Sequence, residues 1–337
     1  MEETRMNPEQ TTVSVVIITY ARPDYIAECI RHLRDLETAP HQIIAVDGSP
    51  DTRTRDLIAS DHPDVLYLRN DLGKGTMSES RQIGLAAATG DIIAFIDDDA
   101  YVAEDWIDRL VAAYADPSVA GVGGRADNGI PGEDAVGLAS IGRLLPNGDI
   151  TGYFAANPGR RIDVDHFLGA NQTYRRAVLL EHGGIRGNYP GTCLREESDT
   201  CLRLRAAGLR LIFDPAVLVR HVAAPYQIGG KRFDRRYLYY SRRNHVMLLA
   251  RVFGWRSAYL PRYGRTALRQ QRHYYAQVAR FMLRGVDEDG ARVSLTRRLT
   301  APVILSRSAV ELAGLAAGVW AGWDGRRRDR RAGVGTP

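Results

Sequence analysis

The sequence predicts an α/β protein, in which a doubly wound, mostly parallel sheet is flanked by helices and followed by a helical C-terminal extension. Short apolar runs at residues 13–19, 43–46 and 92–96 are typical of strands buried on both faces. Apolar residues recur at helical spacing between these runs, and strands that alternate with helices indicate a parallel sheet. Beyond residue 234 the apolar segments are longer and predict helices.

Strand and helix signals alternate through the first hundred residues. Pro23 suits the first turn of a helix, and Gly90 lies just beyond the end of another. In chain order we expect a strand at 13–19, a helix at 23–36, a strand at 42–46, a short helix at 56–59, a strand at 65–68, a helix at 78–88 and a strand at 92–96.

The middle of the chain is less regular. Residues 125–162 are rich in Gly, Pro, Asn and Asp, and long irregular segments of this kind often line binding sites. Acidic residues open a helix that starts at Arg195, and Gly208 follows its end. The remaining expectations are a helix at 104–114, strands at 119–123 and 167–174, a helical turn at 178–182, strand pieces at 211–215 and 216–221, and a helix at 234–253.

Composition is that of an ordinary soluble globular protein. The chain has 337 residues, of which 45% are hydrophobic and 25% charged, and this length suggests about two domains. The net charge of +5 is modest, and we expect no nucleic-acid partner. The cysteines show no metal or redox spacing and fit reduced thiols. Because the first residues lack an apolar core, we expect no signal peptide and a cytoplasmic location.

Three carboxylates close the strand at 92–96. Side chains alternate along a strand, so Asp97 and Asp99 share one face and Asp98 takes the other. Like charges at the end of a buried strand are costly unless a cation or hydrogen-bond donors meet them. Mg²⁺ and Mn²⁺ prefer such oxygens. The run therefore predicts a metal–diphosphate site, and the alternative is a solvated acidic turn.

Polar residues follow several of the predicted strands. Thr19 and Asp47 end two strands, and Asp97 ends a third. Ligands of doubly wound sheets bind outside the carboxyl ends of the strands, so these residues are expected to converge. The sequence has neither a GxGxxG fingerprint after the first strand nor a GxxxxGK[ST] loop. A nucleotide held here would depend on metal and side chains for its phosphates.

An ordered set of motifs extends over most of residues 13 to 221. The motifs are VSVVIITYARP (13–23), IIAVDGSPD (43–51), SRQIGLAAATGDIIAFIDDDA (80–100), FLGANQTYRRAVLLEHGGI (167–185) and REESDTCLRLRAAGLRLIFDPAVLVRH (195–221). In this order they resemble the family 2, GT-A-fold glycosyltransferases. The resemblance implies an inverting, metal-dependent transferase of the hexosyltransferase type that uses a nucleotide-sugar and carries a DXD motif.

The resemblance also implies roles at the donor site. Asp47 would bind the base or ribose, and Asp99 would coordinate Mg²⁺ or Mn²⁺ bridged to the diphosphate. His221 would add a further metal or phosphate contact, with an ordinary strand-end histidine as the alternative. The implied nucleotide-sugar-binding residues are Thr19, Tyr20, Arg22, Asp47, Arg81, Asp97, Asp98, Gly169 and Asn171.

The general base is expected in the pair Glu196-Glu197. Transfer with inversion needs a carboxylate that takes the proton of the acceptor hydroxyl. The motif match favours Glu197, and the choice between Glu196 and Glu197 stays open. Complementarity to the helix dipole would place acids there without any chemistry. Asp199 is expected to orient or cap, and Arg242 to contact acceptor or phosphate or to lie on a solvated face.

The domain boundaries follow from these assignments. Residues 1–11 are expected to be a disordered tail, 12–100 the nucleotide-sugar-binding half and 101–230 the acceptor-binding, catalytic half. Residues 231–337 form the helical extension with a basic tail. The apolar stretch 302–322 is interrupted by charges, so we expect a helix on the core or on the inner face of the membrane rather than a span.

Three function classes remain on the sequence alone. The first is a glycosyltransferase with a UDP-, dTDP- or GDP-sugar donor and a glycan, lipid-linked saccharide or small natural product as acceptor. The second is a sugar-1-phosphate nucleotidyltransferase, which would need a glycine-rich basic loop where residues 20–23 stand. The third is a non-catalytic binding module, which would have no use for both a metal site and a carboxylate pair. The oligomeric state is not indicated.

Overall fold

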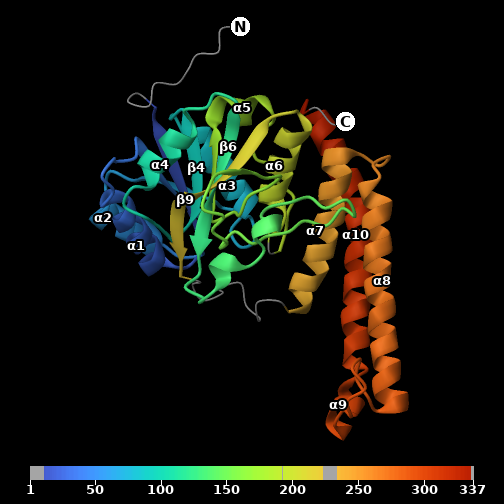
Figure 1. Ribbon diagram of the computed structural model, residues 1–337. Helices are drawn as coiled ribbons and strands as arrows, with labels where there is room; N and C mark the ends of the chain where they lie inside the picture. Colours follow the sequence, from blue (N-terminus) through green and yellow to red (C-terminus); the bar gives the residue numbers. More distant parts are fainter. Residues whose placement is uncertain (1–10, 192, 223–233, 335–337) are drawn as a thin grey trace. The chain divides into compact units, whose positions relative to one another are not determined.

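The computed structural model describes residues 11–191, 193–222 and 234–334 (Figure 1). The chain divides into two compact units. A sheet unit comprises Met1–Leu144 and Ile150–Gly229, and a helical unit comprises Leu145–Asp149 and Gly230–Pro337. The tail expected to be disordered at residues 1–11 lies outside the described residues apart from its last position.

The sheet unit is built on one mixed sheet of nine strands in the order β3-β2-β1-β4-β8-β6-β9-β5, with β7 also paired to β9. The α/β fold class is confirmed. The strands are β1 (Val13–Thr19), β2 (Gln42–Asp47), β3 (Leu66–Arg69), β4 (Ile92–Asp97), β5 (Ala100–Val102), β6 (Val119–Asp127), β7 (Ile162–Asp163), β8 (Asn171–Arg175) and β9 (Arg210–His221).

Parallel pairing is confined to two parts of the sheet. Strands β3, β2, β1 and β4 are parallel, and so are β6 and β9. Strand β8 runs antiparallel between β4 and β6, and β5 and β7 run antiparallel to β9. The register pairs Thr19 with Asp47 and Ile18 with Asp97, so three polar strand ends lie level at one edge.

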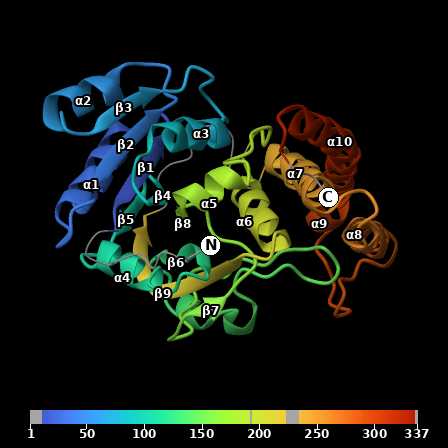
Figure 2. The same ribbon diagram turned by 90° about the horizontal axis from the view of Figure 1, so that it is seen from above.

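Helices cover both faces of the sheet, because every residue of β1 is buried and alternate side chains enter opposite cores. Val15 and Ile17 pack with apolar residues of α1 and α4, whereas Val16 and Ile18 pack with those of α3, α5 and α6 (Figure 2). The helices are α1 (Pro23–Arg34), α2 (Arg53–Asp61), α3 (Met77–Ala87), α4 (Trp106–Ala113), α5 (Arg176–Glu181) and α6 (Glu196–Ala206).

Strand β9 continues through Pro215, where the sequence predicts two separate strand pieces. Its register with β6 shifts between the pairs Gly124–Asp214 and Arg125–Leu218. The residues between Asp214 and Leu218 therefore bulge out of the ladder, which accommodates a proline that lacks the N–H for it. The bulge lets one strand carry its chain on to His221.

The helical unit contains α7 (Arg235–Phe253), α8 (Tyr259–Ala279), α9 (Leu295–Thr300) and α10 (Val303–Arg331). The sequence analysis did not identify α8 as a helix. Helices α7 and α10 approach closely, because Gly314, Gly318 and Gly322 of α10 face α7. A Cβ at Gly314 would lie 2.5 Å from the Tyr239 carbonyl oxygen, and one at Gly322 would lie 2.8 Å from the Ala250 Cβ.

Candidate active site

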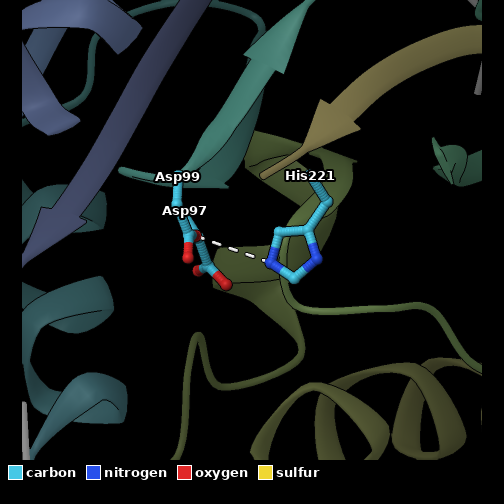
Figure 3. Close-up of side chains that lie close together, drawn as sticks. All are labelled: Asp97, Asp99 and His221. Carbon is cyan, nitrogen blue, oxygen red and sulfur yellow. Dashed lines mark ion pairs between the residues drawn. The ribbon is translucent and has the colours of Figure 1, made fainter. Parts of the chain in front are cut away.

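Three side chains that could ligate a metal ion meet at the carboxyl edge of the sheet. Asp97 ends β4, Asp99 follows it, His221 ends β9, and one potential ligand atom from each lies within 4.8 Å of the others (Figure 3). The Asp99 Oδ1 and His221 Nε2 atoms are 3.5 Å apart. Backbone pairing between Ala100 and His221, with a bond from Val222 N–H to the Asp99 carbonyl, fixes this approach.

Asn128 orients the imidazole of His221. Its Oδ1 lies 3.1 Å from His221 Nδ1. An amide oxygen only accepts, so this contact needs a proton on Nδ1 and leaves Nε2 as the ring nitrogen that lies toward Asp99. Two carboxylates and one oriented imidazole form a donor set that could hold a divalent metal ion.

Asp98 lies in the turn that follows β4, between Asp97 and Asp99 of the cluster in the sequence. Its carboxylate is fully buried, accepts a 2.6 Å hydrogen bond from Thr19 Oγ1 and pairs with the Arg22 guanidinium. Burial raises the pKa of Asp98 to about 7, although Arg22 and Thr19 oppose the rise. Arg22 also reaches Asp99 Oδ2 at 3.2 Å. Hydrogen bonds and ion pairs thus join Thr19, Arg22 and Asp98 beside the cluster.

Asp47 is fully buried at the end of β2. Its carboxylate accepts hydrogen bonds from the Ser49 N–H at 2.8 Å and from the Tyr67 hydroxyl at 3.0 Å. Tyr20 follows β1 and is half-buried. The level register of β1 and β2 brings these residues to the same edge as the cluster.

Arg81 of α3 links the cluster to helix α6. Its guanidinium, 1% exposed, donates to Asp97 Oδ1 at 3.1 Å, to the Gly169 carbonyl at 3.1 Å and to Glu196 Oε1. A Cβ at position 169 would lie 3.1 Å from Arg81 Nη2, so glycine leaves room for the guanidinium. One cation therefore joins elements that are far apart in the sequence.

The two adjacent glutamates at the start of α6 differ in environment. Glu196 is 1% exposed and is occupied by Arg81, whereas Glu197 is half-buried. Burial raises the pKa of Glu197, and the charge of Asp97 adds to the rise. A half-buried carboxylate with a raised pKa is a stronger base than an ordinary surface glutamate.

Asp199 supports the start of the same helix. It is fully buried, accepts a 2.5 Å hydrogen bond from the Tyr189 hydroxyl and lies 3.6 Å from Arg203 Nε. Arg195 precedes the pair with a φ of 81°, a left-handed conformation that is strained for a side-chain-bearing residue. The segment before Glu196 is therefore bent into position and held by buried contacts.

Two predicted site residues have partners that do not belong to the cluster. Asn171 is fully buried in β8, where its amide donates to the Val217 carbonyl at 2.9 Å and accepts from Trp106 Nε1 at 3.3 Å. Arg242 belongs to the helical unit, where it pairs with Glu311 and donates to the Tyr263 hydroxyl.

Comparison with known proteins identifies the family. Residues 14–183, half of the chain, match glycosyl transferase family 2. The chain belongs to this family. The glucosyl-dolichyl phosphate glucuronosyltransferase of Haloferax volcanii is 30% identical over 227 residues, covering 64% of this family 2 chain and 70% of that protein. A pre-mycofactocin glycosyltransferase of Mycobacterium tuberculosis is 29% identical over 214 residues, but the match spans only 43% of its length.

Two solved structures share the fold. The mannosyltransferase PcManGT from Pyrobaculum calidifontis, solved in complex with GDP-Man and Mn²⁺, superposes with a TM-score of 0.58 at 18% identity. The match covers 94% of this chain and 89% of that one. TarS residues 1–349 of S. aureus superpose with a TM-score of 0.51 at 14% identity. These likenesses confirm the GT-A-type fold.

Three side chains at the site of this family 2 protein lay outside our sequence predictions: Asn128, Tyr67 and Tyr189. Asn128 could have been found, because it follows β6, which lies beside β9 in the sheet. Strand β6 is longer than predicted and ends at Asp127. Tyr67 and Tyr189 had no local signal, since their partners Asp47 and Asp199 are set by tertiary packing.

Proposed function

We propose that this protein is an inverting glycosyltransferase that moves a sugar from a nucleotide-diphosphate sugar to an acceptor hydroxyl. The observation that carries the proposal is Arg81, which holds the carboxylates of the metal-ligand cluster and of the Glu196-Glu197 helix in one assembly. Membership of glycosyl transferase family 2 supports it and favours it over a nucleotidyltransferase or a binding module.

The donor side requires a divalent ion, Mg²⁺ or Mn²⁺. Asp99 and His221 would hold the ion, and Asp97 would lie beside them. When bound, the ion supplies Lewis-acid stabilisation of the leaving diphosphate. Asp47, whose carboxylate is held by hydrogen bonds from Ser49 and Tyr67, would contact the base or ribose. The Mn²⁺ and GDP-Man held by PcManGT, which has a similar fold, support this assignment.

The acceptor side requires a base, for which we propose Glu197. Its carboxylate takes the proton of the acceptor hydroxyl as that oxygen bonds to the anomeric carbon and the bond from carbon to diphosphate breaks. Glu196, occupied by Arg81, would position the first turn of α6. Asp199 would keep the turn in place through Tyr189.

The acceptor is proposed to be a glycan, a lipid-linked saccharide or a small natural product, reached from the cytoplasm. Relatives support this range. The name of the Haloferax volcanii relative includes glucosyl-dolichyl phosphate, which is a lipid-linked saccharide. Another, the succinoglycan biosynthesis protein ExoM of Rhizobium meliloti, is 27% identical over 267 residues.

The proposal is tested first by calorimetric titration of UDP, dTDP and GDP with Mn²⁺ or Mg²⁺, and again after EDTA. We expect one nucleotide to bind only with metal, and Asp99→Asn to abolish this binding. Asp56→Asn, an exposed acid on α2, is the matched control and should bind normally. Folded protein that binds none of the three, or that releases pyrophosphate from a nucleoside triphosphate and a sugar-1-phosphate, would overturn the proposal.

A further inference from the structure

Charge is distributed unevenly along the chain. Residues 230–337 contain 23 Lys and Arg against seven Asp and Glu, a net charge of +16. Residues 1–229 contain 22 Lys and Arg against 33 Asp and Glu, a net charge of −11. The modest total of +5 therefore hides a strongly basic helical unit. A surface of this charge is attracted to polyanions and to anionic lipid.

An apolar stripe runs along the exposed face of α10. Its members follow helical spacing and carry no charge. Of its large hydrophobic members, the most exposed are Val319, Trp320 and Trp323, at 53%, 66% and 49%. We define the outer stripe as Ala309, Leu312, Ala316, Val319, Trp320 and Trp323.

The opposite face of α10 is already used within the bundle. A Cβ on Gly318 would lie 2.7 Å from the Val246 Cβ of α7, which leaves no room for a larger residue. Asp329 of the same helix forms a buried ion pair with Arg251 of α7. The outer stripe therefore faces away from the only close helix partners that the described part of this unit provides.

Arginines continue the outer stripe toward the C-terminus. The Arg327 guanidinium lies 5.5 Å from the centroid of the Trp323 ring, and Arg330 and Arg331 are exposed beyond it. Tryptophan beside arginine on one face of a helix is typical of segments that lie in the membrane–water interface. The aromatic rings enter the headgroup region while the guanidinium groups meet lipid phosphates.

We propose that the outer stripe of α10 docks this protein on the surface of an anionic lipid bilayer, with the helix lying in the interface. By length and composition the segment Leu295–Arg331 could cross a membrane, with a mean hydropathy of 1.4 over its most apolar window. The hydrogen bonds of α10 argue against a membrane-spanning helix. Glu311 is 1% exposed and accepts hydrogen bonds from Arg242 of α7 and Tyr274 of α8. A spanning α10 would lose these partners and leave a carboxylate in hydrocarbon.

Flotation of the full chain with phosphatidylcholine vesicles, with and without phosphatidylglycerol, tests the proposal. We expect flotation only with phosphatidylglycerol and release by high salt or alkaline carbonate. The double variant Trp320→Ser, Trp323→Ser should lower the bound fraction at least about tenfold, because the rings supply most of the inserted area. Leu295→Ser, Leu299→Ser, which removes two exposed apolar residues of α9, is the matched control and should float like the parent.

Several results would overturn the docking surface. They are flotation that survives the tryptophan double variant, equal flotation on neutral vesicles, and resistance to carbonate extraction, which marks a spanning helix. A dimer that the tryptophan variant dissociates, without any lipid binding, would show that the stripe covers a second copy instead. Thermal unfolding and nucleotide titration of the same variant report separately on folding and on the proposed donor site.

Discussion

Asp97 and Glu196 share one buried cation. The Arg81 guanidinium donates to Asp97 at the end of β4 and to Glu196 at the start of α6, so the proposed metal ligands and the proposed base cannot move independently. The third contact of Arg81, with the Gly169 carbonyl, ties the strand-entry loop before β8 to the same point. The proposed donor and acceptor sides of the site are thereby joined through one side chain.

Arg81→Ala is expected to lower the free energy of unfolding by about 3–5 kcal/mol, because it leaves Glu196 buried without its partner. Arg81→Lys should also destabilise the fold, since an ammonium cannot reproduce the planar fork that serves three acceptors. Urea unfolding followed by circular dichroism measures both. Arg53→Ala, an exposed arginine on α2, is the control and should leave the unfolding midpoint in place. An unfolding midpoint of Arg81→Ala equal to that of the parent would contradict the role of Arg81 in joining Asp97 and Glu196.

Glu197→Gln is expected to keep metal-dependent nucleotide binding and to reduce sugar transfer by at least about a hundredfold. The amide has nearly the shape of the carboxylate but cannot take a proton. Glu196→Gln should behave differently, with a loss of unfolding stability because its charge pairs with Arg81. Transfer assays and calorimetry on both variants separate the two roles. Near-normal transfer by Glu197→Gln would refute its assignment as base.

The pH dependence of transfer should report the raised pKa of Glu197. A general base acts when deprotonated, so a pKa above the ordinary 4.5 moves the acidic limb of the rate profile to higher pH. Activity is therefore lost, as pH falls, before an ordinary surface glutamate would protonate. The profile of kcat/KM measures this limb in the free enzyme. A limb at or below pH 4.5, or one that persists in Glu197→Gln, would count against the assignment.

Gly318→Val is expected to lower the free energy of unfolding by about 1–3 kcal/mol through overpacking of α7 against α10. Even the first carbon of the new side chain would lie 2.7 Å from the Val246 Cβ and 2.8 Å from the Arg243 carbonyl oxygen. Ala316→Val, on the exposed face of the same helix, should change stability by less than about 0.5 kcal/mol. Denaturant titration compares them, and equal effects would mean that the close approach of the two helices is wrong.

Local pattern was sufficient for most of the fold and for part of the site. The run from Ile92 to Asp97 predicts the buried strand, because a short apolar run is a local signal. The strand ends at Asp97, so Asp98 and Asp99 lie in a turn, where the alternation of a strand does not apply. The Arg81–Glu196 pair could not be predicted, since it depends on how α3 and α6 pack across the sheet. The same holds for Asn171, whose polar side chain indicates a ligand but bonds within the core.

The bulge at Pro215 determines which face of the sheet each later side chain of β9 takes. Side chains of a strand alternate between faces, so the number of residues in the bulge decides whether His221 points to the carboxylates or away from them. A loss or gain of one residue there would turn the imidazole to the other side, and it would also move Val219, which is fully buried, off the core face. Whether the proposed metal site has its third side chain thus depends on whether the bulge between Asp214 and Leu218 holds an odd or an even number of residues.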